Sequence, residues 1–176
     1  KPVGIVTPED IVYRLMVELT RIAEEADRRQ QVLQAKISQF EAPAPSVKRE
    51  FPIATGDYEN AGLAASSAKA EMRSRGVDPI ISRRAAIALY EAETNIIIHS
   101  IGGRITFDIT DDKFIADAVD WGPGIPNVEQ AMVPGYSTAG EFVRALGFGA
   151  GMGLPNIKKC ADHFQIESTP DKGTRL

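Results

Sequence analysis

The spacing of apolar and polar positions predicts a long helix at the start of the chain. Residues 1–10 indicate the end of a strand and a helix start, because Thr7 suits an N-cap and Pro8 a first helical position. Residues 11–40 contain no Gly or Pro and continue the helix. Apolar residues recur there at spacings of four and three, interrupted by two basic residues, and they are Leu15, Leu19, Ile22, Ala26, Leu33 and Phe40. This partial heptad repeat leaves two alternatives open: pairing with a second copy as a homodimer, or packing on the chain's own domain.

A proline-containing segment, residues 41–46, follows the helix and is the best candidate for a domain boundary. The remainder, residues 47–176, mixes strand and helix patterns. Strands are predicted at 47–54, 104–110, 113–120 and 164–168, with a last one from Thr174, and helices at 56–75, 80–100 and 154–162. These elements predict an α+β domain: a two-layer sandwich of a mixed, mostly antiparallel sheet with helices on one face, preceded by the long helix.

Composition narrows the class of protein. The chain has 176 residues, of which 43% are apolar and 25% charged, which suits one soluble domain with a short appendage. The net charge of −4 argues against a nucleic-acid partner, and no apolar run approaches the roughly 20 residues that span a bilayer. A single cysteine, Cys160, excludes an internal disulfide and fits a reducing compartment. We therefore expect a cytoplasmic protein with no membrane span, whose sequence begins within a longer polypeptide.

Three polar residues lie on one stripe of the predicted helix 80–100, because Glu91, Asn95 and His99 are spaced four apart. An amide oxygen is a neutral ligand for Mg²⁺, and a carboxylate can take a proton from an attacking hydroxyl. The stripe therefore suits a phosphate site, although a solvated polar stripe is the alternative.

A second motif starts at the end of the strand 113–120. Asp120 is followed closely by Gly122 and Gly124, so its carboxylate can point into a cleft while the backbone passes close to a flat ligand. An acceptor there suits the exocyclic amine of adenine. The alternative is a Gly-Pro turn that Asp120 caps.

The third motif is a run of alternating glycines, residues 147–153, that leads directly into a helix. Successive backbone N–H groups and a helix start together form a phosphate cradle without a lysine. The run matches neither the P-loop nor the dinucleotide fingerprint. Its alternative is a flexible loop, and a nucleotide lid would also need to move.

The order and spacing of these motifs resemble the GHKL (Bergerat-fold) ATP-binding superfamily, and within it the anti-sigma-factor and stressosome-switch type of bacterial serine kinases. The resemblance covers about residues 47–176. It is carried by E-A-E-T-N at 91–95 with His99, D-W-G-P-G-I-P from 120, G-Y-S-T at 135–138 and G-A-G-M-G-L-P-N-I-K-K at 149–159.

The resemblance implies roles for individual residues. Glu91 would be the general base, Asn95 would hold Mg²⁺ against the phosphates, and Asp120 would accept from the adenine amine. The implied nucleotide-binding residues are Asn95, Asp120, Gly122, Gly124, Thr138, Gly149, Gly151, Met152, Gly153, Leu154 and Thr174. Residues 130–153 would form the ATP lid. Within the lid, Arg144 either reaches the γ-phosphate or lies on a surface helix, and the role of His99 stays open.

The implied function is an ATP- and Mg²⁺-dependent serine/threonine protein kinase that phosphorylates a regulatory partner protein. The expected partner is an anti-sigma-antagonist-like protein as the substrate, or a sigma-type factor. The alternative is a non-catalytic module that ATP or ADP gates, so that it captures or releases a partner. The ATP-binding half of a histidine kinase is less favoured, because residues 8–40 contain no histidine to accept a phosphoryl group.

Residues 4–10 are similar to the closing strand and helix start of a CBS domain. In that family a T-x-x-D pair, here Thr7 and Asp10, faces an adenine nucleotide. The resemblance implies a ligand-sensing CBS pair upstream of this sequence, with the helix 11–40 as the connection. The alternative for both residues is a plain helix cap.

Overall fold

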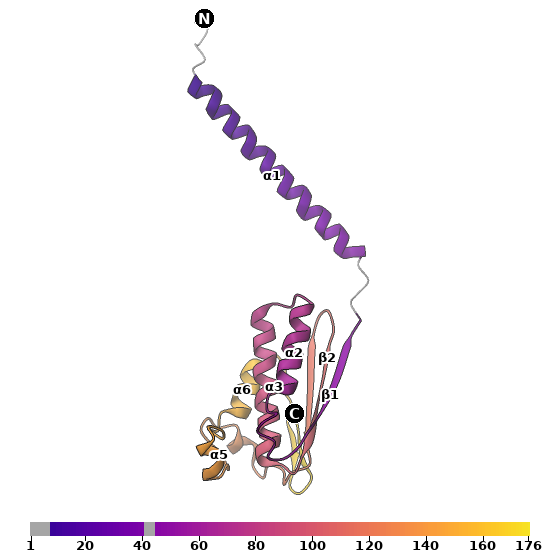
Figure 1. The fold of residues 1–176 in the computed structure, drawn as a ribbon, viewed down its shortest axis with the longest axis vertical. Helices are drawn as coiled ribbons and strands as arrows, with labels where there is room; N and C mark the ends of the chain where they lie inside the picture. The colour runs from indigo at the N-terminus through magenta and orange to yellow at the C-terminus, as the bar shows by residue number, and fades with distance from the viewer. Residues whose placement is uncertain (1–7, 41–44) are drawn as a thin grey trace, which may run out of the picture. The chain divides into compact units, whose positions relative to one another are not determined.

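The computed structural model describes the backbone of residues 8–40 and 45–176, and within the first range the side chains of residues 14–33 (Figure 1). The chain divides into two units after residue 44, and each is treated separately below. The predicted helix cap at Thr7, the CBS-like strand and most of the linker 41–46 fall outside the described residues, so these predictions stay predictions.

The long N-terminal helix is confirmed as α1, Pro8–Phe40, a single helix of 33 residues. Ion pairs spaced three and four residues apart support it, such as Arg21 with Glu18 at 2.6 Å and Arg29 with Glu25 at 3.2 Å. Every described side chain is exposed, including the apolar seam residues Leu15, Leu19, Ile22 and Leu33. Both homodimer formation and packing of this seam on the chain's own domain stay predictions. Among the described helices, none is long and apolar enough to cross a membrane.

The second unit contains one five-stranded sheet. Its strands are β1 (Val47–Ile53), β2 (Gly103–Ile109), β3 (Phe114–Asp120), β4 (Glu167–Thr169) and β5 (Gly173–Arg175), in the order β1-β2-β3-β5-β4. The predicted α+β class is confirmed. The sheet was expected to be mixed, but every pairing among the described strands is antiparallel. Tight turns explain two of these pairings, since β2 joins β3, and β4 joins β5, through short hairpins.

Helices cover one face of this sheet, which confirms the predicted two layers (Figure 1). They are α2 (Leu63–Ser74), α3 (Pro79–His99) and α6 (Gly153–Cys160), while α4 (Val128–Ala131) and α5 (Glu141–Ala145) are short helices between β3 and α6. The central helix α3 packs against both α2 and α6. It therefore holds a fixed position between two helices and the sheet.

The expected helix 56–75 begins later than predicted, at Leu63. Gly56 and Gly62 adopt left-handed backbone angles, with φ of 70° and 98°, so the segment before α2 turns instead of coiling. The N-terminus of α2 is capped from the neighbouring helix, because Oε1 of the buried Glu93 accepts from the N–H of Ala64 at 3.4 Å. The strand expected over 164–168 also starts late, at Glu167.

The core lies between the sheet and the helices. Alternate side chains of β2 point into it. The Phe107 side chain is 1% exposed, and its ring packs against those of Phe51 and Phe114, with a distance of 5.8 Å between ring centroids in each pair. From the helix side, Met72 and Leu89 are each 1% exposed. Burying a side chain of this size contributes about 1.5–3 kcal/mol to folding. This packing holds α3, and the polar residues on its other face, in place.

Candidate functional site

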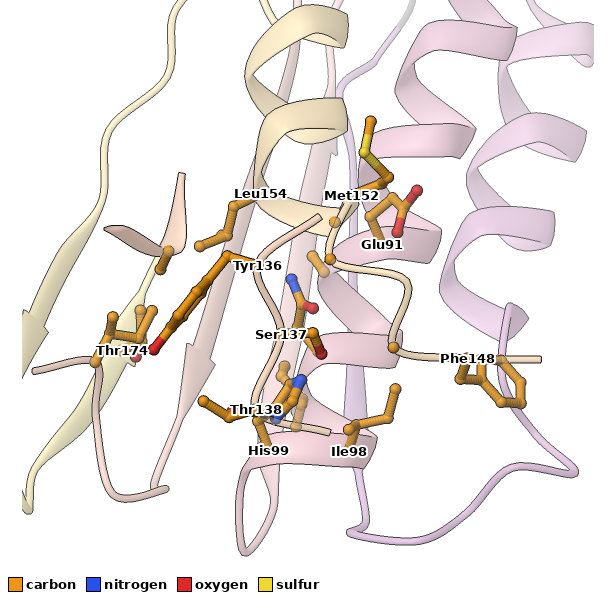
Figure 2. Close-up of a pocket in the computed structure, with 18 of the residues that line it drawn as sticks. Glu91, Ile98, His99, Tyr136, Ser137, Thr138, Phe148, Met152, Leu154 and Thr174 are labelled. Atoms are coloured by element: carbon orange, nitrogen blue, oxygen red, sulfur yellow. Dashed lines mark hydrogen bonds between the residues drawn. The ribbon is translucent and has the colours of Figure 1, made fainter. Parts of the chain in front are cut away.

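A cavity of about 820 Å³ opens between α3, the end of β3 and the segment that leads into α6 (Figure 2). Eleven of the twelve residues predicted for the site line it, namely Glu91, Asn95, Asp120, Gly124, Thr138, Gly149, Gly151, Met152, Gly153, Leu154 and Thr174. The exception is Gly122, which is buried behind Asp120 and donates its N–H to Oδ1 of that residue at 2.7 Å. Gly122 therefore supports the site without lining it.

One face of α3 supplies the polar wall of the cavity. The helix starts as predicted, with Asp78 accepting from the N–H of Ile80 at 2.6 Å and Pro79 in the first turn. Glu91, Asn95 and His99 all line the cavity, and the helical rise places the first about 12 Å from the last. The predicted stripe is thus a row of three different functional groups along one side of the cavity.

The carboxylate of Glu91 is held by a residue that the sequence did not single out for a role. Its Oε1 accepts from Nδ2 of Asn156 on α6, at 2.6 Å. Asn156 lies within the motif that carries the family resemblance, but no spacing rule connects it to a residue 65 positions earlier. Only the packing of α6 on α3 brings the two together.

The amide of Asn95 lies against the first residue of α6. A Cβ on Gly153 would come within 2.9 Å of Asn95 Oδ1, so a glycine is required for this approach. Asn95 Nδ2 is buried and, within the described part of the chain, has no hydrogen-bond partner. Because buried amides are normally paired, Asn95 has bonding capacity that suits a ligand of the cavity.

The start of α6 suits an anion. Its N-cap residue, Met152, makes no side-chain cap hydrogen bond, so the helix presents backbone N–H groups and its positive dipole end. Gly149 and Gly151 precede it with φ of 73° each, and Gly151 accepts from the N–H of Gly135 at 2.9 Å. This geometry suits the predicted phosphate cradle, and phosphate binding there stays a prediction.

The far end of the cavity is formed around Asp120. Its Oδ1 lies between the N–H of Gly122 and the backbone of Gly173, where an added Cβ would approach Oδ1 to 3.1 Å. Thr174 lines the same end, and Ala118 and Ile96 add apolar wall. A carboxylate acceptor next to an apolar slot suits a flat ring that carries an amine.

His99 lies on the floor of the cavity, near Asp120. Burial lowers the pKa of His99 below its ordinary value, and the negative charge of Asp120 opposes part of that decrease. The imidazole is therefore mainly neutral at pH 7. Its Nδ1 is 3.4 Å from Oγ1 of Thr138, so the predicted Thr138 lies next to His99 (Figure 2).

The segment 130–153 contributes residues to the cavity lining, and its role as the ATP lid stays a prediction. Within it, Arg144 belongs to the short, exposed helix α5 and donates to the carbonyl of Ser137 at 3.2 Å, which agrees with the surface-helix alternative. Two aromatic residues were not predicted: Tyr136, whose hydroxyl points toward Thr174, and Phe148 (Figure 2). The Phe148 ring packs on Tyr58 at 5.6 Å.

Comparison with known proteins agrees with this geometry. The model of the histidine kinase-like ATPase domain matches residues 54–176. The chain therefore belongs to the histidine kinase-like ATPase domain family, and the predicted resemblance is confirmed.

Individual relatives place the chain more closely. It is 39% identical to the anti-sigma F factor of Caldanaerobacter subterraneus over 105 residues, which cover 56% of this chain and 70% of that protein. It is 37% identical to the anti-sigma F factor of a Thermoanaerobacter strain, with the same coverage. It is 32% identical to the serine/threonine-protein kinase RsbT of Bacillus subtilis, over 57% of this chain and 73% of that protein. Within its family, the chain is thus similar to the anti-sigma and serine kinase type.

Proposed function

We propose that this chain is an ATP- and Mg²⁺-dependent kinase that phosphorylates a serine or threonine of a regulatory partner protein. One observation carries the proposal: Glu91 and Asn95, one helical turn apart on α3, line the same cavity as the glycine-rich start of α6 and Asp120. The family supports ATP as the ligand, and the names of the relatives support protein phosphorylation.

The order of groups along the cavity suggests how ATP would lie. Asp120 and Thr174 at one end would hold the adenine, and the start of α6 would take the phosphates next to Asn95. Glu91, at the other end of the α3 stripe, would then lie nearest the γ-phosphate and an incoming hydroxyl. Bound Mg²⁺ would neutralise phosphate charge, with Asn95 as its protein ligand.

The residues of this chain would then perform a simple transfer. Glu91 would take the proton of the partner's hydroxyl, while the hydroxyl oxygen bonds to the γ-phosphorus and the bond from that phosphorus to ADP breaks. The N–H groups at the start of α6 would stabilise charge on the phosphate oxygens. Because the base is placed for a protein hydroxyl, we expect slow ATP hydrolysis when no partner is present.

A second candidate function is a nucleotide-gated binding module without phosphotransfer. The lid favours it, because Phe142 and Leu146 of the lid are 71% and 46% exposed and offer an apolar contact surface. ATP or ADP would order this surface, and a partner would bind or leave accordingly. The predicted sigma-type partner and the cytoplasmic location belong to the same proposal and stay predictions.

The variant Glu91→Gln separates the two functions. Under the kinase proposal, transfer of labelled phosphate from ATP to a candidate anti-sigma-antagonist protein should fall by roughly 10²- to 10⁴-fold, because the general base is lost. ATP affinity should stay near the wild-type value. The exposed Glu59, which does not line the cavity, provides the control Glu59→Gln. Wild-type transfer by Glu91→Gln would contradict the role of Glu91 as the general base. Nucleotide-dependent partner binding by the wild type without any transfer would contradict the kinase proposal and support the second function.

A further inference from the structure

The contact between Asn156 and Glu91 joins two elements of the site. Asn156 is the fourth residue of α6, and its Nδ2 donates to Glu91 Oε1 at 2.6 Å, with both side chains partly buried. A hydrogen bond to a carboxylate is stronger and shorter than one between neutral groups. This bond therefore restrains a side chain that otherwise has three rotatable bonds.

We propose that Asn156 is a positioning residue, which holds the carboxylate of Glu91 in the orientation required for proton transfer. The proposal rests on the proposed function, in which Glu91 is the general base. Among the described residues, Asn156 is the only side chain that donates to the carboxylate of Glu91, and it does so at Oε1. The second carboxylate oxygen is left to accept the proton of the substrate hydroxyl.

The chemical nature of Asn156 suits this role. A lysine at this position would place a positive charge next to the carboxylate and make it a weaker base, whereas an amide donates a hydrogen bond and stays neutral. Lysines are present on the same helix, but Lys158 and Lys159 are exposed. The group that faces Glu91 is thus the neutral donor.

The helix α6 also connects Glu91 to the proposed phosphate site. Asn156 follows Gly153, the first residue of α6, by less than one turn. The other end of α6 is fixed to α3, because Arg84 donates to the carbonyl of Cys160 at 3.0 Å and pairs with Asp162 at 2.7 Å. A phosphate bound at the start of α6 would therefore meet a helix that already holds the base.

The test is a series of variants in the phosphotransfer assay. Asn156→Ala should lower kcat by roughly 10- to 100-fold, because a small misplacement of a catalytic group has effects of this order. The KM for ATP, the affinity for ATP and the unfolding midpoint should change little. Lys158→Ala, an exposed position on the same helix, is the matched control and should behave as the wild type.

Two further measurements distinguish positioning from a structural role. Asn156→Asp places a second carboxylate against Glu91, so kcat should fall below that of Asn156→Ala at neutral pH and recover on acidification, when the pair can share a proton. In a Glu91→Gln background, Asn156→Ala should cause no further loss, because there is no base to position.

The outcomes separate this inference from the proposed function. If Glu91→Gln abolishes transfer while Asn156→Ala keeps the wild-type kcat, the positioning role is wrong and the kinase proposal stands. A loss explained by weaker ATP binding or a lower unfolding midpoint would also overturn it. If Glu91→Gln transfers phosphate normally, Glu91 is not the base and the positioning role fails with it. If the wild type transfers no phosphate at all, the kinase proposal itself fails.

Discussion

Helix α3 and the lid segment 130–153 line the same cavity, yet they are held in place in different ways. Eight of the 21 residues of α3 are buried, and the helix is packed between α2, α6 and the sheet. In the lid, every residue of which is described, only Ala139 is buried. The lid contains the end of the four-residue helix α4, the five-residue helix α5 and several glycines with positive φ. The site thus combines a fixed wall that carries the chemical groups with a wall held by few contacts.

This difference in packing predicts which segment controls nucleotide affinity and which controls stability. Segments with few buried contacts open at a small cost in free energy, whereas packed core helices open only with the whole domain. Changes in the lid should therefore alter nucleotide affinity and leave the unfolding midpoint almost unchanged. Changes under α3 should alter the unfolding midpoint first.

The largest effect is expected for a glycine in the lid. Gly151 has φ of 73°, and an added Cβ would lie 2.6 Å from the carbonyl oxygen of Tyr136 and 2.7 Å from that of Gly135. Gly151→Ala should therefore displace the cradle and weaken ATP binding by roughly 10- to 100-fold, as measured by titration calorimetry.

Two other glycines of the lid serve as comparisons for this loss of ATP affinity. Gly147 also has a positive φ, of 88°, but an added Cβ would meet nothing within 4 Å, so Gly147→Ala tests backbone strain alone. Gly140 has φ of −70° and open space, so Gly140→Ala is the neutral control. ATP affinity should fall in the order Gly140, Gly147, Gly151. Equal affinities for all three variants, or a large loss of stability in Gly151→Ala, would contradict the contrast between the lid and α3.

A smaller effect, on stability, is expected for the buried Glu93 of α3. Glu93→Ala removes the acceptor at the N-terminus of α2 and should lower the free energy of unfolding by about 1–2 kcal/mol, measured in urea. Glu93→Gln keeps an acceptor of the same shape and should cost less. ATP affinity should be similar in both variants, and a selective loss of ATP binding would contradict the assignment of Glu93 to the core.

The Glu93 carboxyl also predicts a dependence of stability on pH. Burial raises the pKa of Glu93 above its ordinary value of 4.5, and hydrogen bonds from the N-terminus of α2 oppose part of that increase. Between 4.5 and the raised pKa, the folded state binds more protons than the unfolded state, so stability decreases as the pH rises through this range. The wild type should therefore lose stability relative to Glu93→Gln on going from acidic to neutral pH. A parallel pH dependence of the two proteins would show that Glu93 does not titrate in this way.

The features that can be predicted from the sequence are those that depend on local signals. The start of α3 at Pro79 and the stripe of Glu91, Asn95 and His99 follow from helical spacing and capping, which are local properties. The α+β class follows from the alternation of strand and helix patterns. Local signals also single out the glycines of the proposed phosphate cradle, because a run of glycines before a helix is unusual.

The remaining features depend on contacts between distant segments. The contact of Asn156 with Glu91 depends on how α6 packs on α3, and no local pattern encodes it. The late start of α2 depends on Glu93, which replaces a local cap with a group from another helix. Gly122 was assigned to the cavity wall because it adjoins Asp120, but the turn directs it behind that carboxylate.

The central claim is that Asp120 at one end of this cavity recognises the adenine of ATP, and nucleotide selectivity tests it most directly. Inosine triphosphate has a carbonyl oxygen where adenine has its exocyclic amine, so the Asp120 carboxylate would face an acceptor instead of a donor. Wild-type protein should bind ATP at least roughly 10-fold more tightly than inosine triphosphate, and Asp120→Asn, whose amide can donate, should abolish that preference. Equal binding of both nucleotides by the wild type, or an unchanged preference in Asp120→Asn, would contradict the account.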